Sequence, residues 1–207
     1  MNDLNFFKKN GYLIKENLID QKTINKINKV VNEIVSKEKN KKKIINRTQS
    51  YNNYHFVYNS SYKKNKEILR LNNPQNRHKI FYDLSRSKEI ISLTKKLLNG
   101  TVRFHLGKLN FKLPNKKKGS EIGWHQDWAF YPHTNDDLIT VGIYLDDCFE
   151  KNGPLRIIKN SHKKKLYNHH DKENFFVGKI DIKKNKIGVN NSVSITGTAG
   201  TVVFFHC

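Results

Sequence analysis

The spacing of apolar residues changes once along the chain, at Asn99-Gly100, and this change limits the folds that the sequence can adopt. Before it, apolar side chains recur every three or four residues, which predicts helices over residues 24–35 and 80–98, and Asp20 is the expected N-cap of the first of these helices. After it, apolar and polar residues alternate in short segments between Gly, Pro and Asn turns, which is typical of strands. The expected strands are 101–106, 108–113, 121–128, 138–145, 155–158, 193–195 and 201–206. Helices followed by many short strands predict an α+β fold with a jelly-roll or barrel core.

The N-terminal part gives three further expectations. Residues 4–14 predict a short helix, a stop at Gly11 and an apolar strand. Residues 44–62 are polar and rich in tyrosine, and both a loop and a short helix fit them. A chain of 207 residues is long enough for one well-cored domain. We therefore expect a single domain over 1–207, mainly helical in 1–100 and a jelly roll in 101–207.

The net charge suggests a class of partner that the rest of the sequence does not support. The chain has 39 Lys and Arg against 18 Asp and Glu, a formal net charge of +21. Such a charge favours nucleic acid or an anionic membrane as a partner. However, lysine is spread over almost the whole chain with abundant Asn and Ile, and no arginine-rich arm or zinc-finger spacing is present. A biased composition explains this pattern, so we do not expect nucleic-acid binding as the main function.

Cysteine usage and the lack of apolar runs indicate a compartment. The two cysteines, Cys148 and Cys207, are too few and too far apart for a disulfide framework or a zinc site. The N-terminus lacks the order of a signal peptide, and no apolar run is long enough to span a membrane. We therefore expect a cytoplasmic protein; the sequence does not indicate an oligomeric state.

The stretch Gly123 to His133 carries the strongest chemical signal. On the expected strand, His125 and Asp127 point to the same face, because strand side chains alternate with period two. An imidazole and a carboxylate make two-thirds of the facial triad of non-haem Fe(II) oxygenases. The alternative is a surface histidine beside an unrelated aspartate. The aromatic residues around the pair favour a walled pocket: Trp124, Trp128, Phe130 and Tyr131.

Further motifs follow in a recognisable order. They are Trp124-His125-Gln126-Asp127-Trp128, Tyr131 to Asp137, Asn152-Gly153-Pro154-Leu155, Asn160-Ser161-His162-Lys163, His169-His170-Asp171 and Gly197 to His206. Together with Phe7 to Leu18, this series resembles the phytanoyl-CoA dioxygenase family of Fe(II)- and 2-oxoglutarate-dependent oxygenases, over nearly the whole chain.

The resemblance implies a fold and an activity. The fold is a double-stranded β-helix, a cupin-like jelly roll, in which His125 and Asp127 are iron ligands. The implied reaction uses Fe(II), 2-oxoglutarate and O2 to hydroxylate a small organic substrate, and it releases succinate and CO2. Related halogenases have a small residue in place of the acidic ligand; because Asp127 is present, hydroxylation is expected.

The resemblance also implies roles for residues around the metal. Lys108 takes a position where family members contact 2-oxoglutarate, and Thr140 on the strand 138–145 is a second candidate contact. A solvent-facing lysine is the alternative for Lys108. The substrate pocket would be bordered by Trp128, Tyr131, His133 and Asp136. The last three fit equally well as loop residues bonded to the backbone.

The sequence departs from the family pattern at its end. After a Phe-Phe-His like that of 204–206, the family continues with a second metal histidine and an arginine for the far carboxylate of 2-oxoglutarate. This sequence stops at Cys207, so we expect a piece of a longer oxygenase that lacks its closing strands. Two alternatives stay open: a non-catalytic jelly roll that acts as a binding or structural module, and a site whose third ligand comes from His206 or a partner chain. His206 shares a strand face with Val202 and Phe204, which favours a packed histidine over a ligand.

Overall fold

The computed structural model describes residues 1–40, 55–58, 67–112 and 122–207. By its internal contacts the chain divides into two compact units, so the expectation of a single domain stays a prediction. The first unit comprises 1–19, 93–101 and 122–207, and the second comprises 20–92 and 102–121. Helices occur together with antiparallel sheets, in agreement with the predicted α+β class. No helix in the described ranges is long and apolar enough to cross a membrane.

The first unit begins with a helix and a strand joined by a glycine turn. Helix α1 (Asp3–Asn10) is capped by Asn2, whose side chain accepts a hydrogen bond from the Asn5 N–H at 2.9 Å. Gly11 ends the helix with φ +82°, and its N–H donates to the Phe7 carbonyl. Strand β1 (Tyr12–Lys15) follows directly. The helix, the glycine stop and the strand expected over residues 4–14 are therefore confirmed.

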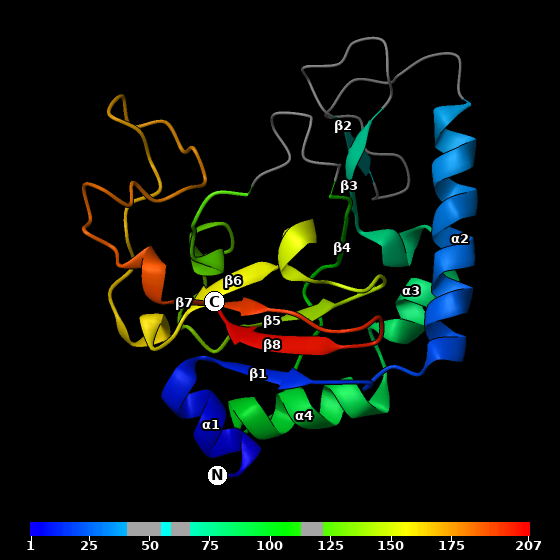
Figure 1. The fold of residues 1–207 in the computed structure, drawn as a ribbon, viewed down its shortest axis with the longest axis horizontal. Helices are drawn as coiled ribbons and strands as arrows, with labels where there is room; N and C mark the ends of the chain where they lie inside the picture. The colour runs from blue at the N-terminus through cyan, green and yellow to red at the C-terminus, as the bar shows by residue number, and fades with distance from the viewer. Residues whose placement is uncertain (41–54, 59–66, 113–121) are drawn as a thin grey trace. The chain divides into compact units, whose positions relative to one another are not determined.

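Two antiparallel sheets form the body of the first unit (Figure 1). In the larger sheet, β8 (Val202–His206) lies between β1 and β5 (Ile139–Ile143). The smaller sheet pairs β6 (Leu155–Ile158) with β7 (Ser192–Ile195). These strands confirm four of the expected segments, although β5 and β8 are shorter than predicted.

The two sheets pack against each other through one apolar cluster. Its buried centre consists of Tyr12 from β1, Val203 from β8 and Ile195 from β7. Partly buried apolar side chains surround it, namely Phe6, Ile14, Tyr144, Leu155, Ile157, Val193 and Phe205. Because members of the cluster come from both sheets, burial of their apolar surface holds the two sheets face to face.

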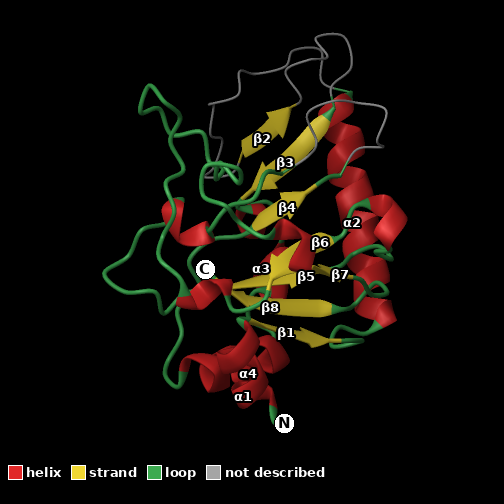
Figure 2. Ribbon diagram, turned by 60° about the vertical axis from the view of Figure 1, so that its left-hand side comes forward, coloured by secondary structure: helices red, strands yellow, loops and turns green. Residues whose placement is uncertain are grey.

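The second unit contains a three-stranded sheet and the long helix α2 (Gln21–Lys39), which Asp20 caps as predicted (Figure 2). The strands are β2 (His55–Tyr58), β3 (Ile68–Asn72) and β4 (Lys108–Asn110), in the order β2-β3-β4. The loop or short helix expected over 44–62 is wrong where it can be compared, because 55–58 form a strand. The rest of that segment lies outside the described residues.

The helix predicted over 80–98 is two helices, α3 (Lys79–Leu84) and α4 (Lys88–Leu98). Two serines at the junction bond to neighbouring backbone groups and end the continuous pattern. The Ser85 hydroxyl donates to the Tyr82 carbonyl at 2.7 Å, and the Ser87 hydroxyl accepts from the Ile90 N–H at 3.5 Å. Such local side-chain bonds compete with helix propagation, which apolar spacing does not reveal. Short 3₁₀ turns complete the described elements: Pro74–Asn76, Asp127–Ala129, Glu150–Asn152, Ser161–Lys163 and Val189–Asn191.

Three expected strands differ from the structure. Residues 101–106 form no strand, and Phe104 is exposed despite the alternating pattern. Of 108–113, only 108–110 form a strand, and 113 lies outside the described residues. Residues 122–128 are not a strand either, because the Gln126 N–H donates to a histidine side chain rather than to a neighbouring strand.

Candidate metal centre

His125 and Asp127 converge at one point of the first unit. The His125 Nε2 atom lies 3.2 Å from the Asp127 Oδ1 atom, and the side chains are 26% and 19% exposed, so solvent can reach both. The Nδ1 atom of His125 lies 2.7 Å from the Gly123 carbonyl oxygen. A carbonyl only accepts hydrogen bonds, so Nδ1 carries a proton and directs Nε2 toward the carboxylate. Either a second proton or a cation is then needed between the two facing atoms.

The reason for this convergence differs from the one expected. Asp127 begins a 3₁₀ turn, in which the Phe130 N–H donates to the Asp127 carbonyl at 2.9 Å. Gln126 nevertheless has extended backbone angles, φ −112° and ψ 128°. Because an extended residue places its two neighbours on the same side, the argument from period two holds locally without a strand.

Gln126 fixes the backbone between the two donors. Its N–H donates to the Nε2 atom of His169 at 2.9 Å, and its side-chain oxygen accepts from the Tyr167 N–H at 2.8 Å. The Nδ1 atom of His169 lies 2.8 Å from the Tyr167 carbonyl, and His169 is only 2% exposed. Burial lowers the pKa of His169, which favours the neutral ring that can accept from Gln126. Both residues lie in the family-like motifs of the sequence, but no role was predicted for either of them.

Thr140 supports the carboxylate directly. It lies on β5, and its hydroxyl donates to the Asp127 Oδ2 atom at 2.5 Å. This bond engages the oxygen that does not face His125 and so orients the carboxylate. The structure therefore shows Thr140 as a partner of Asp127, whereas its expected contact to 2-oxoglutarate stays a prediction.

Aromatic side chains lie against His125. The ring of Phe130 meets the ring of His125 edge to face, with centroids 5.4 Å apart, and meets Phe176 at 5.1 Å. Gly178 has φ +64°, and a Cβ atom there would lie 2.7 Å from the Phe130 ring, so a glycine permits this contact. The aromatic residues around the pair were predicted, but Phe176 was not, because 46 residues separate it from its partner Phe130 along the chain.

The other predicted pocket residues are held by the backbone or by other groups. The Trp128 indole donates to the Asn135 carbonyl at 3.0 Å, and the His133 Nδ1 atom lies 2.5 Å from the Tyr131 carbonyl. A carboxylate oxygen of Asp136 lies 3.8 Å from the His206 Nε2 atom. Their expected role in binding substrate stays a prediction. Lys108 lies on β4 of the second unit and is exposed.

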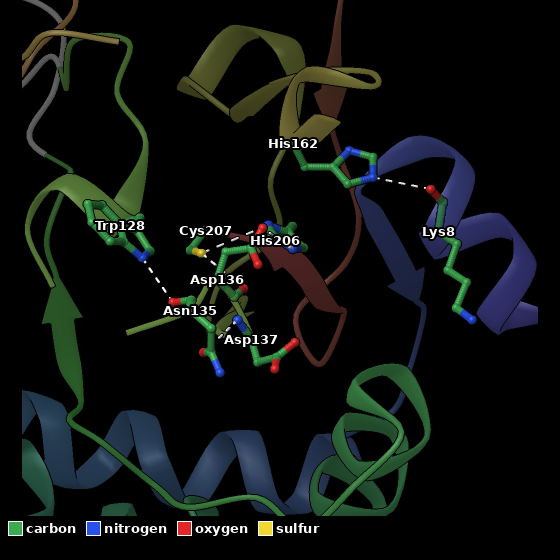
Figure 3. Close-up of polar contacts among 8 residues, drawn as sticks. All are labelled: Lys8, Trp128, Asn135, Asp136, Asp137, His162, His206 and Cys207. Atoms are coloured by element: carbon green, nitrogen blue, oxygen red, sulfur yellow. Dashed lines mark hydrogen bonds and ion pairs between the residues drawn. The ribbon is translucent and has the colours of Figure 1, made fainter. Parts of the chain in front are cut away.

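His206 belongs to a different cluster of the first unit (Figure 3). On β5 and β8, Ile139 pairs with His206 and Thr140 pairs with Phe205, so His206 and Thr140 lie on opposite faces of the sheet. The His206 ring lies 5.3 Å from the ring of His162, and burial lowers the pKa of both histidines. We call Asp136, His162 and His206 the His162–His206 cluster.

A hydrogen bond to the end of α1 fixes the position of the His162 ring. Its Nε2 atom donates to the Lys8 carbonyl at 3.2 Å, whereas its Nδ1 atom is buried without a hydrogen-bond partner. A Cβ atom on Gly11 would lie 2.4 Å from that Nδ1 atom. The Nδ1 atom is therefore buried next to the Gly11 backbone.

The His125–Asp127 pair fits two positions of an iron site. Two neighbouring ligand atoms, each about 2.1 Å from an ion and about 90° apart, are roughly 3.0 Å from each other. The observed 3.2 Å is close to this value. Over the ranges that the structure describes, however, no three His, Cys, Asp or Glu side chains form a group that could hold a metal. Among the described residues, the pair therefore offers two ligand atoms for such a site.

Two curated proteins show the sequence relationship. A probable alpha-ketoglutarate-dependent hypophosphite dioxygenase of Stutzerimonas stutzeri is 38% identical over 151 residues, which cover 70% of this chain and 52% of that protein. The L-proline trans-4-hydroxylase of Streptomyces griseoviridis is 30% identical over 142 residues, which cover 59% of this chain and 52% of that protein. The chain thus spans about half the length of the curated relatives it matches.

Solved structures show the same fold. The apo form of EctD from S. alaskensis has a TM-score of 0.76 at 19% identity and covers 99% of this chain and 67% of its own. EctD with 2-oxoglutarate and 5-hydroxyectoine has a TM-score of 0.72 at 20% identity, with coverage of 99% and 66%. The family model described as phytanoyl-CoA dioxygenase matches residues 7–207. The chain therefore belongs to the phytanoyl-CoA dioxygenase family.

Proposed function

We propose that this chain carries the iron site of an Fe(II)- and 2-oxoglutarate-dependent dioxygenase that hydroxylates a small organic substrate. The observation that carries the proposal is the convergence of His125 Nε2 and Asp127 Oδ1 at 3.2 Å in a member of this family. Both relatives named above are oxygenases by name, and one is described as alpha-ketoglutarate-dependent.

Residues around His125 and Asp127 hold the two side chains in position for this role. Thr140 orients the Asp127 carboxylate, and the bond from Gln126 to His169 holds the backbone between the two donors. When bound, iron would hold 2-oxoglutarate and O2 together and supply the oxidising chemistry. The aromatic rings of Phe130 and Phe176 would shield one side of the site from water.

We further propose the jelly-roll form of the fold for the first unit. Two antiparallel sheets packed face to face support it, as does the structural likeness to EctD. Lys108 remains a candidate contact to 2-oxoglutarate, on the basis of the family resemblance. The names of the relatives refer to hypophosphite, proline and ectoine, so no single substrate is transferred to this chain.

A non-catalytic jelly roll is the alternative, and one observation favours it: among the described residues, no three possible ligand side chains form a group that could hold a metal. An anaerobic titration of the purified chain with Fe(II), then with 2-oxoglutarate, separates the two functions. The proposal predicts a visible metal-to-ligand charge-transfer band that His125→Ala removes. A folded chain that shows no band at saturating Fe(II) and 2-oxoglutarate would support the non-catalytic module instead.

A further inference from the structure

A turn of the first unit presents three consecutive apolar side chains to solvent. Phe175, Phe176 and Val177 are 67%, 46% and 42% exposed, and we call them the Phe175–Val177 turn. They belong to the segment 163–179, which lies between β6 and β7 in the chain and extends away from both strands (Figure 1). A contiguous group of exposed apolar residues, unlike a single one, typically marks an interaction surface.

Hydrogen bonds fix the backbone of this turn. The Asp171 Oδ1 atom accepts from the N–H groups of Glu173 and Phe175, at 3.0 and 2.9 Å. The Phe175 carbonyl in turn accepts from the Asp171 N–H at 2.9 Å, and at the base of the turn the His169 carbonyl accepts from the Val177 N–H at 2.9 Å. The exposed side chains are therefore held in place rather than free to fold back onto the sheets.

Phe176 ties the turn to the rest of the first unit. Its ring meets the rings of Phe130 and His170 edge to face, with centroids 5.1 and 5.4 Å away. Phe175 is the most exposed of the three apolar side chains. The turn therefore has an anchored residue and, next to it, apolar surface that water covers.

The charge around the turn is mainly positive. The segment 163–179 contains five lysines and two acidic residues, Asp171 and Glu173. Asp171 bonds to the backbone of the turn, and a Glu173 carboxylate oxygen lies 3.9 Å from the Lys172 ammonium. All five lysines are exposed, namely Lys163, Lys164, Lys165, Lys172 and Lys179. This positive rim is complementary to an anionic surface, where each lysine adds about fivefold in affinity.

We propose that the Phe175–Val177 turn docks on the surface of an anionic lipid bilayer. The apolar side chains enter between the lipid head groups, and the lysines pair with the phosphates around them. Single-stranded nucleic acid also attracts lysine and phenylalanine, but it rewards flat side chains that stack on bases. Val177 cannot stack in this way, yet it gains from leaving water. This inference does not rest on the proposed function, because binding to a bilayer needs no metal.

Co-sedimentation of the chain with sucrose-loaded vesicles tests the apolar part of the surface. Vesicles of phosphatidylcholine alone are compared with vesicles that also contain about 30% phosphatidylserine, at about 0.15 M salt. We expect the anionic vesicles to bind at least about tenfold more tightly. Phe175→Ser should weaken this binding by about fivefold or more. Phe149→Ser, at an exposed phenylalanine of the same unit, should change it by less than about twofold.

A pair of matched double variants tests the charged part. Lys172→Gln combined with Lys179→Gln should weaken binding to the anionic vesicles by about tenfold or more, because two cations of the rim are lost. Lys22→Gln combined with Lys26→Gln removes the same charge from exposed positions of α2 and should weaken it by less than about threefold. Equal losses in the two double variants overturn the proposal, because binding would then follow the net charge alone.

The remaining outcomes also decide the proposal. Equal affinity of Phe175→Ser and the unaltered chain overturns it, because no apolar side chain of the turn would then enter the bilayer. Phe175→Trp gives an independent readout: its added fluorescence should shift to shorter wavelength with anionic vesicles and stay unchanged with phosphatidylcholine alone. If the chain binds single-stranded DNA through Phe175 and does not bind vesicles, the surface belongs to nucleic acid and the proposal is wrong.

Discussion

Two places in the first unit bring histidine and aspartate together, and they are built differently. In the His125–Asp127 pair, a backbone carbonyl holds the far nitrogen of the ring, so Nε2 faces the carboxylate at 3.2 Å. In the His162–His206 cluster, the Nε2 atom of His162 donates a hydrogen bond to the Lys8 carbonyl, and its Nδ1 atom lies against Gly11. The cluster has more histidines, but the pair has the better geometry. Ring orientation and access, rather than composition, make a metal site.

The largest expected difference lies in metal affinity. Asp127→Ala should weaken Mn(II) binding by more than about 100-fold, because losing a ligand costs more than the 10- to 100-fold typical of an outer-shell partner. His206→Ala should change it by less than about threefold, because His206 faces the other side of the sheet. Electron paramagnetic resonance of free Mn(II) measures both affinities. Equal losses of Mn(II) affinity in the two variants would contradict the assignment of metal binding to the His125–Asp127 pair rather than to the His162–His206 cluster.

The next effect concerns His169, which acts on the pair through the Gln126 backbone. His169→Leu should weaken Mn(II) binding by about 10-fold, because the amide between the two donors loses its acceptor. His169→Gln offers an acceptor of similar reach and should recover most of the affinity. His170→Gln is the matched control, since His170 is exposed and bonds to Asn168. If leucine and glutamine at 169 lower affinity and melting temperature equally, His169 has only a structural role.

Substitutions in or next to the His162–His206 cluster should change the free energy of unfolding rather than the metal affinity. Gly11→Ala should lower the free energy of unfolding by about 2 kcal/mol, because a non-glycine residue is strained at φ +82° and its Cβ meets His162. Gly188→Ala is the control, since its φ is −75° and a Cβ there meets nothing within 4 Å. Urea unfolding compares the two. A loss of Mn(II) affinity in folded Gly11→Ala would contradict the conclusion that the cluster takes no part in metal binding by the His125–Asp127 pair.

A smaller effect is expected from Thr140. Thr140→Val removes the hydroxyl that bonds to Asp127 Oδ2 and should weaken Mn(II) binding by about 5- to 10-fold, at or below the lower end of the 10- to 100-fold range for an outer-shell partner. Thr140→Ser keeps the hydroxyl and should bind within about twofold of the unaltered chain. The same resonance titration measures both variants. Unchanged affinity in Thr140→Val means that the carboxylate is oriented without this bond.

The smallest expected effect is a pH dependence of stability that arises in the cluster. Burial lowers the pKa of His162 and His206 below the ordinary value of 6.5, so near and below that pH the unfolded chain binds more protons than the folded one. The free energy of unfolding should therefore fall as the pH drops from 7.5 to 5.5. His162→Gln should reduce this slope, as urea unfolding at the two pH values can show. A slope that is unchanged in the variant would exclude His162 as a source.

The sequence predicts some parts of the molecule well because their signals are local. The Asp20 cap, the Gly11 stop and the strands β5 to β8 follow from residues close to one another in the chain. The missed features depend on distant contacts. The Gln126 N–H bonds to His169, 43 residues away, so no alternating pattern could show that residues 122–128 are not a strand. The convergence of His125 and Asp127 was predicted, because one extended residue is enough to produce it.

The most direct test observes the histidine nitrogens while a metal is added. A chain labelled with 15N-histidine has nine rings, and Zn(II) strongly shifts the nitrogen that it binds. The account predicts that the Nε2 signal of His125 changes first and saturates, while the signals of His162 and His206 stay in place. A saturating shift at His162 or His206, with His125 unchanged, would contradict it.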